Sequence, residues 1–240
     1  MKPGKNCLKL DLKHGLFVRF MRRFIAAKSH NQRSFFNMGH YTGPKARINR
    51  RLGLDIYDSA GALRATHRRP HPPGKQPTRR RRPTDYARAL IEKQKIRHYY
   101  GLSQTQLERF FKIAKKQGGN KGQNLLLLCE RRLDNVVSRS GLATTRAQGR
   151  QAVAHGHFMV NGRKTDIPSY ICKTGDTIQV RARENLQKIY SKRLEGNDAP
   201  ECTFIAVEPA EMMAKIVSDP SPEDIGVPVN INQVVEFLSR

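Results

Sequence analysis

Helical patterns are clearest in the middle of the chain, where apolar residues recur every three to four positions between polar ones. Thr84 and Asp85 are suitable caps for a helix that ends near Gly101. Ser103 begins a second helix, and Gln106 stands at its capping-box position. The aromatic residues of this second helix are predicted to be buried rather than to stack on bases.

A third apolar stripe predicts a helix from about Asn124 to Gly141. Its apolar positions are Leu125, Leu128, Leu133, Val136 and Val137. A short fourth helix is predicted from Thr145, which forms a capping box with Gln148, to Ala154.

The pattern then changes to that of strands. Asn161 and Gly162 form the strongest short signal for a tight hairpin, and Gly175 and Asp176 lead into a last alternating strand. Two helices therefore precede a small antiparallel sheet, which indicates an α+β region.

The segment of residues 67–85 contains too many prolines for a regular element and is predicted to be extended or looped. Within it, four successive arginines repel one another unless phosphates lie between them. We therefore expect the segment to become ordered on RNA, with a disordered basic linker as the alternative.

The net charge points to a polyanionic partner. Lys and Arg number 45 against 20 Asp and Glu, a formal net charge of +25, and nucleic acid is the polyanion that best balances such an excess. Residues 184–240 reverse this trend, with 10 acidic and 5 basic residues. An acidic tail fits a protein neighbour, an intramolecular partner or an ordinary solvated face.

The helix that begins at Thr145 carries the most specific candidate chemistry. Arg146 and Arg150 are four residues apart, a like-charge pair that is unfavourable in isolation and is explained if phosphates neutralise it. Gln151 and His155 extend the same surface, and the helix N-terminus offers free N–H groups to an anion. Two further candidates adjoin the hairpin turn, Arg163 and Lys164.

Other chemistries find little support. Cysteines occur only at positions 7, 129, 172 and 202, without a CxxC pair, so neither a zinc ribbon nor a disulfide framework is indicated. His67 and His71 make a poor metal site without thiolate or carboxylate partners. The sequence contains no run of about 18 apolar residues, which argues against a membrane span. It also contains no P-loop fingerprint. We expect no metal and no cofactor.

One stretch of about fifty residues resembles a known family. The sequence RLDNVVSRSGLATTRAQGRQAVAHGHFMVNGRKTDIPSYICKTGDTIQV is similar to the S4 RNA-binding domain, with its RLD, TTRAxxRQ, VNG, PSY and GD elements in order. That domain also occurs in pseudouridine synthases, a heat-shock RNA-binding protein and some tyrosyl-tRNA synthetases. The resemblance therefore implies RNA binding without specifying the ribosome.

The flanking sequences narrow the family. YTGPKARINRRLG, PTDYARALIEKQKIRHYYGLSQTQLERFF and INQVVEFLSR resemble the flanks of the S4 family of small-subunit ribosomal proteins, so the resemblance covers residues 39–240. It implies an α+β fold: a mainly helical domain (38–129 with 196–240) and an inserted S4 RNA-binding domain (130–195) of two helices packed on a small antiparallel sheet. Many relatives bind zinc through N-terminal cysteines, which the corresponding stretch here lacks.

The same resemblance implies a function. We expect a non-enzymatic ribosomal protein, cytoplasmic and on the ribosome, that binds small-subunit rRNA early in assembly, contacts ribosomal protein S5 in support of accuracy, and lies beside the mRNA entry channel. Asp134 is expected to be a structural anchor. In the basic half, the expected RNA contacts are Tyr41, Lys45, Arg47, Arg50, Arg51, Arg79, Arg80, Arg81, Arg82, Lys93, Lys95 and Arg97.

Several alternatives remain at the level of sequence. A pseudouridine synthase would need a catalytic domain larger than the 57 residues after Arg183, whereas a free-standing S4-domain factor of the heat-shock type would not. Residues 1–37 form an N-terminal extension with a possible amphipathic helix. This extension fits an upstream start codon with Met38 as the true initiator, an organellar transit peptide, or an RNA-contacting arm.

Overall fold

The computed structural model describes residues 41–57, 59–75, 82–196, 202–221 and 224–239. All of these residues lie in the unit Tyr41–Arg240. The predicted N-terminal extension and the candidates Arg79, Arg80 and Arg81 lie outside the described residues.

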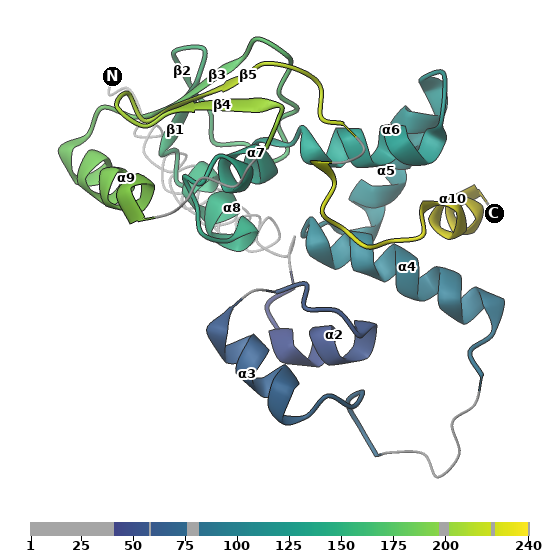
Figure 1. Cartoon of the computed structure of the whole chain (residues 1–240). Helices are drawn as coiled ribbons and strands as arrows, with labels where there is room; N and C mark the ends of the chain where they lie inside the picture. The colour runs from purple at the N-terminus through teal and green to yellow at the C-terminus, as the bar shows by residue number, and fades with distance from the viewer. Residues whose placement is uncertain (1–40, 58, 76–81, 197–201, 222–223, 240) are drawn as a thin grey trace, which may run out of the picture. The chain divides into compact units, whose positions relative to one another are not determined.

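Two short helices, α2 (Lys45–Leu52) and α3 (Ala60–Arg68), pack against each other at the start of the described chain (Figure 1). The sequence pattern predicts neither, because their apolar faces are small. Ile48, Leu52 and Ile56 form the buried core of this part. The proline-rich residues 69–75 that follow contain no helix or strand, as predicted.

The next two predicted helices are confirmed with their caps. In α4 (Asp85–Tyr99) the Thr84 hydroxyl accepts a hydrogen bond from the Ala87 N–H. In α5 (Gln104–Lys116) Ser103 and Gln106 form a complete capping box. The aromatic residues of α5 are buried, as predicted, in a core shared with α4 and the next helix.

The predicted third helix is wrong in one respect, because the chain forms two helices there: α6 (Lys121–Glu130) and α7 (Leu133–Arg139). Between them the backbone pairs with a distant segment. The Arg131 carbonyl accepts from the Cys172 N–H at 2.8 Å, and the Leu133 N–H donates to the Tyr170 carbonyl at 2.8 Å. These backbone hydrogen bonds replace those of a continuous helix, and no local sequence pattern predicts them.

The sheet has five antiparallel strands in the order β2-β1-β3-β5-β4. They are β1 (Phe158–Val160), β2 (Arg163–Lys164), β3 (Thr177–Val180), β4 (Ile205–Glu208) and β5 (Met213–Ile216). Asn161 (φ 50°) and Gly162 (φ 76°) adopt the left-handed conformation that the tight β1–β2 turn requires. The hairpin and β3 are confirmed, but β3 is not the last strand.

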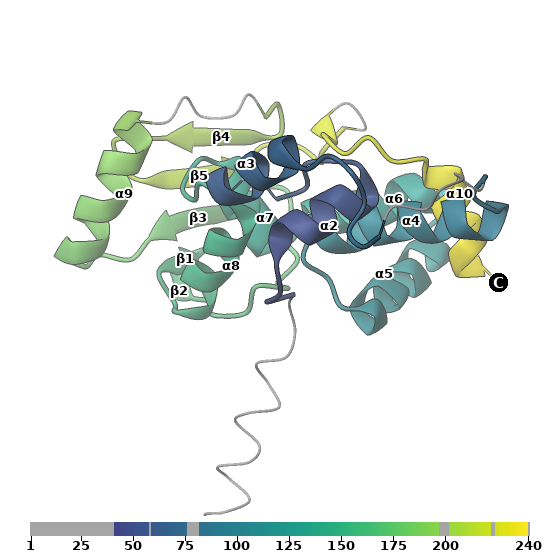
Figure 2. The same ribbon diagram turned by 90° about the horizontal axis from the view of Figure 1, so that it is seen from below.

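Helices cover one face of this sheet. α7, α8 (Arg146–Ala154) and α9 (Glu184–Gly196) share a core with the inward side chains of the strands, such as Phe158, Ile178 and Ala214. Figures 1 and 2 show α7 and α8 lying on the same side of the sheet. The opposite face carries exposed or half-buried side chains, such as Gln179 and Lys215. α8 is thus held in place by a core built from distant segments.

The C-terminal part serves both the sheet and the helices. β5 pairs with β3 and β4 with β5, although the family resemblance implied that residues 196–240 belong to the helical domain. α10 (Ile231–Ser239) packs instead on α4 and α6, which Figure 1 shows side by side with it. The sheet therefore extends past the expected boundary at residue 196, because β5 finds its hydrogen-bond partners in β3 and β4 finds its own in β5.

Candidate nucleic-acid interface

α8 lies close against α7 because a glycine stands at their contact. A Cβ atom on Gly149 would lie 2.9 Å from the Asp134 carbonyl oxygen, so no side chain fits there. The Thr145 hydroxyl caps α8 by accepting a hydrogen bond from the backbone N–H of Gln148. The side-chain oxygen of Gln148 accepts from the backbone N–H of Thr144, and not from that of Thr145 as the predicted capping box requires. This close contact brings the arginines of α8 to the start of α7.

Arg146 connects α8 to α4. Its Nε donates to the Asn135 side-chain oxygen at 2.9 Å, and its guanidinium lies 3.7 Å over the centre of the Tyr99 ring. Asn135 is buried, and its amide in turn donates to Glu130. Arg146 is therefore part of a structural network as well as a candidate for RNA contact.

Arg150 shares a carboxylate with a buried arginine. Asp134 Oδ2 lies 2.5 Å from Arg132 Nη2 and 3.3 Å from Arg150 Nη1. Arg132 is 0% exposed, so Asp134 is the counter-ion for a fully buried charge. Asp134 and Asn135 thus hold the two arginines of α8 in place, but one carboxylate cannot neutralise Arg132, Arg146 and Arg150 together, so the cluster keeps a net positive charge.

A second buried carboxylate lies where α6 ends. Glu130 accepts from the Tyr100 hydroxyl at 2.6 Å and from Arg139 Nη2 at 3.1 Å. Arg139 also donates to the Asp224 carbonyl at 2.9 Å, which ties the acidic tail to α7. Sequence reasoning missed this network, because a glutamate and an arginine nine positions apart in an apolar stripe carry no local signal.

The hairpin presents its two cations to solvent. Arg163 and Lys164 are exposed, and no ion pair involving either is found among the described residues. Asn161 fixes the turn beside them: its side-chain N–H donates to Asp176 at 2.8 Å and its oxygen accepts from the Thr177 N–H at 2.9 Å. The hairpin therefore holds two free positive charges on a rigid turn.

α2 and α3 carry cations without acids. Lys45, Arg47 and Arg51 are exposed, and neither helix contains an acidic residue. Arg50 differs, because its Nε donates to the His71 carbonyl at 2.7 Å. Tyr41 donates to the Pro44 carbonyl and lies edge-on to His98. Two exposed arginines of α3, Arg64 and Arg68, extend the positive surface and were not among the predicted candidates.

The predicted contacts on α4 need a correction. Lys93 is only 5% exposed, and its ammonium lies 4.5 Å over the Phe237 ring of α10. Because α10 covers this ammonium, it is not accessible to a phosphate in this structure, and burial also lowers its pKa from the usual value. Lys95 pairs with Glu92 at 2.6 Å, and Arg97 donates to the Leu102 carbonyl at 3.3 Å. Of the four-arginine run only Arg82 is described, and it is exposed.

Gln151 and His155 lie exposed on α8, as the predicted surface requires. The described residues contain no group of three or more His, Cys, Asp or Glu side chains that could hold a metal ion. Within the same ranges, no helix is long and apolar enough to cross a membrane. What remains is a set of exposed cations and amides on α2, α3, α8 and the hairpin, suited to phosphate and base contacts.

The chain is similar to known proteins over most of its length. A family model described as the ribosomal protein S4/S9 N-terminal domain matches residues 40–130, and an S4 domain model matches residues 131–178. The chain is 52% identical over 203 residues to the small ribosomal subunit protein uS4 of Rhodopirellula baltica. It is 44% and 42% identical to the proteins of the same name from Roseiflexus castenholzii and Halothermothrix orenii. Each match covers 85% of this chain and 100% of the relative.

Proposed function

The chain belongs to the ribosomal protein S4 family, and on this basis we propose that it binds small-subunit rRNA directly as a structural protein of the small ribosomal subunit. The observation that carries the proposal is that its relatives match over their full length, and not through the S4 domain alone. A pseudouridine synthase or a free-standing S4-domain factor would share only that domain. Proteins of this family are structural rather than enzymatic.

The proposed RNA contacts are exposed side chains for which no hydrogen bond or ion pair to the described part of the protein is found. They are the exposed cations of α2 and α3, the two cations of the hairpin, Gln151 of α8 and His155 directly after it. Arg146 and Arg150 would contact RNA through those guanidinium nitrogen atoms that do not bond to Asn135, Tyr99 or Asp134. Because A-form major grooves are too deep and narrow for side chains, most contacts go to phosphates and sugars, and the protein recognises RNA shape.

The family resemblance extends the proposal to partners. The protein would work in the cytoplasm on the ribosome, nucleate assembly of the subunit body, contact ribosomal protein S5 at an interface that affects accuracy, and lie near incoming mRNA. Cross-linking of reconstituted small subunits tests the S5 contact: recovery of cross-links to other proteins but none to S5 would remove it.

Direct rRNA binding is tested with the full chain and a transcript of small-subunit rRNA. We expect nanomolar-range binding at low salt and a steep loss of affinity as salt rises, because each phosphate contact contributes about 0.9 to the logarithmic salt slope on a duplex. Sedimentation provides the second test. The protein should remain stoichiometric in small subunits in salt that strips loosely bound factors, and its loss together with those factors would favour a free-standing factor.

A further inference from the structure

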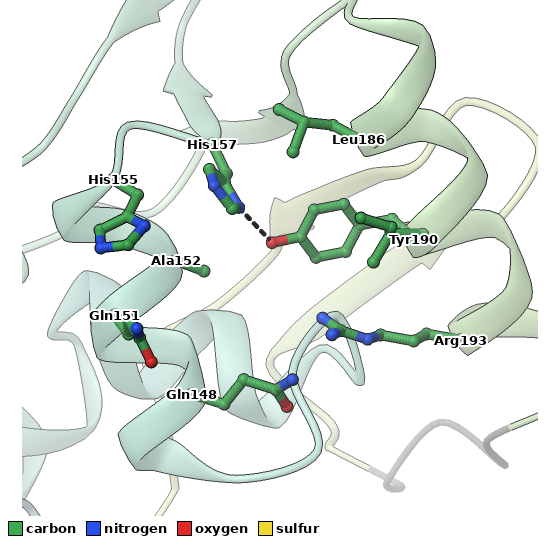
Figure 3. A pocket seen from close by; sticks show the side chains of 9 residues that line it. Gln148, Gln151, Ala152, His155, His157, Leu186, Tyr190 and Arg193 are labelled. Atoms are coloured by element: carbon green, nitrogen blue, oxygen red, sulfur yellow. Dashed lines mark hydrogen bonds between the residues drawn. The ribbon is translucent and has the colours of Figure 1, made fainter.

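A hollow of about 190 Å³ lies between α8 and α9, and it shares Gln151 and His155 with the predicted RNA-binding surface. Figure 3 shows Tyr190 and Arg193 projecting from α9 toward α8, which contributes Gln148 and Gln151, while His155 and His157 follow α8 at one end. None of its lining residues is acidic. The hollow is thus open to an anionic ligand.

The floor of the hollow is rigid. Tyr190 is 1% exposed, its ring packs on Phe158 with centroids 5.4 Å apart, and its hydroxyl lies 3.0 Å from His157 Nδ1. Arg193 lies over the Tyr190 ring with its guanidinium 5.2 Å from the ring centre. The buried Tyr190 ring therefore supports Arg193, and a ligand meets the positive charge of Arg193 rather than the ring itself.

The rim offers apolar area and unused hydrogen-bonding groups. Ile189 is 46% exposed and adds apolar area to the rim. The Gln151 amide has no hydrogen-bond partner among the described residues, so both its donor and its acceptor are available. The side-chain oxygen of Gln148 accepts a hydrogen bond from the Thr144 N–H, and its side-chain NH₂ group stays available.

Charge and size restrict the class of ligand. Burial, together with the neighbouring His155 and the positive charges of Arg193, Arg183 and Arg181, lowers the pKa of His157. The volume of about 190 Å³ is below the roughly 300–1,000 Å³ of pockets that enclose drug-sized ligands. The hollow can hold one planar group of a larger anionic molecule rather than a whole free ligand.

We propose that this hollow is a subsite for one unstacked nucleotide of the RNA. The base packs against Ile189, its edge forms hydrogen bonds with Gln151 and the Gln148 NH₂ group, and its phosphate lies by Arg193. Unpaired bases are the parts of RNA that proteins read by their edges, because they can leave the helix stack. The inference rests on the proposed rRNA binding and adds a base contact to a surface otherwise dominated by phosphates.

The test uses the full chain, a small-subunit rRNA transcript and chemical probing of base edges. In Gln151→Ala and Ile189→Ala we expect affinity to fall by about 5- to 10-fold, as for the loss of one base contact. The same one or few unpaired nucleotides should lose protection at their base edges, while the backbone footprint is unchanged. The matched controls are Gln187→Ala, an exposed glutamine of α9, and Ile167→Ala, an exposed isoleucine of the loop after β2.

The outcomes separate the two proposals. If both pocket variants bind and protect the transcript as the unaltered chain does, the subsite is overturned while rRNA binding stands. If the unaltered chain does not bind the transcript, the proposed function fails as well. Photo-cross-linking with 4-thiouridine-substituted rRNA in reconstituted subunits gives a third readout: adducts on the α8 and α9 peptides support the subsite, whereas a ribosomal protein cross-linked there in their place overturns it.

Discussion

Two helices of this protein carry the same sequence pattern and use it differently. In α8, Arg146 and Arg150 are four residues apart, and in α2 Arg47 and Arg51 have the same spacing. The α8 arginines contact Asn135, Tyr99 and the Asp134 carboxylate. The α2 arginines are exposed on a helix without acidic residues.

The difference shows that arginine spacing alone does not identify an RNA contact. A pair of cations on one helix face can be neutralised by phosphates or by carboxylates from another element, and only the folded structure distinguishes the two cases. In α8 the partners of the two arginines, one carboxylate and one neutral amide, come from the start of α7, which lies beside α8 because Gly149 permits it. We therefore expect the α8 arginines to affect mainly stability and the α2 arginines mainly RNA affinity.

The largest expected effect is at the carboxylate that the α8 arginines depend on. Asp134→Ala should lower the free energy of unfolding by about 3–5 kcal/mol, because it leaves the charge of Arg132 buried and unpaired. Arg132 Nη1 already has no hydrogen-bond partner among the described residues, and the Phe110 ring 5.7 Å from the guanidinium carbon cannot replace a carboxylate. Urea unfolding of the full chain measures the change.

The matched control is Asp85→Ala. Asp85 pairs with Arg88, but its side chain is 90% exposed, and such surface pairs contribute little. Equal stability losses for the two variants would contradict a structural role for Asp134. They would favour the alternative that the α8 arginines are neutralised by RNA phosphates.

The next effect separates the two arginine pairs directly. Arg146→Ala should cost about 1–3 kcal/mol of stability, because it removes the stacking on Tyr99 and leaves the buried Asn135 oxygen without its donor. Arg146→Lys should recover only part of this loss, since an ammonium cannot replace the planar guanidinium. Arg47→Ala, measured by the same urea unfolding, should stay within about 0.5 kcal/mol. A stability loss in Arg47→Ala as large as that in Arg146→Ala would remove the contrast.

RNA affinity should show the opposite order. The double variant Arg47→Ala with Arg51→Ala should bind the rRNA transcript more weakly and lower the logarithmic salt slope by about 1.8, or about 0.9 for each phosphate contact on a duplex. Its stability should be unchanged, because neither side chain has a protein partner to lose. Filter binding over a range of salt concentrations measures the slope, and an unaltered slope would exclude the α2 arginines from the interface.

The effect that is smallest at neutral pH concerns His98 of α4, which lies near the positive charges of Arg97 and Arg51. Burial, together with Arg97 and Arg51, lowers the pKa of His98 from 6.5 to about 4. Between these pH values the unfolded chain binds more protons than the folded one, so stability is lost as pH falls through the window. His98→Gln should flatten the pH dependence of the free energy of unfolding there, measured without RNA. An identical profile for the variant would mean that His98 titrates normally.

The sequence predicts local structure best where a cap or a turn specifies it. Thr84, Ser103, Thr145 and the Asn161–Gly162 turn all act where predicted, because each satisfies backbone groups or a backbone conformation within four residues. The split between α6 and α7 was missed, because its cause lies forty residues away at Cys172. The buried position of Lys93 was missed for the same kind of reason, since α10 covers it.

The sequence alone therefore determined the chemical class of this protein: the excess of positive charge, the capped helices, the tight hairpin and the motifs of the S4 family follow from residues close together in the chain. The tertiary structure decided which cations are free. Coulomb attraction and hydrogen bonding act between atoms close in space. A carboxylate such as Asp134 thus determines the role of Arg150 only once folding has brought α7 and α8 into contact.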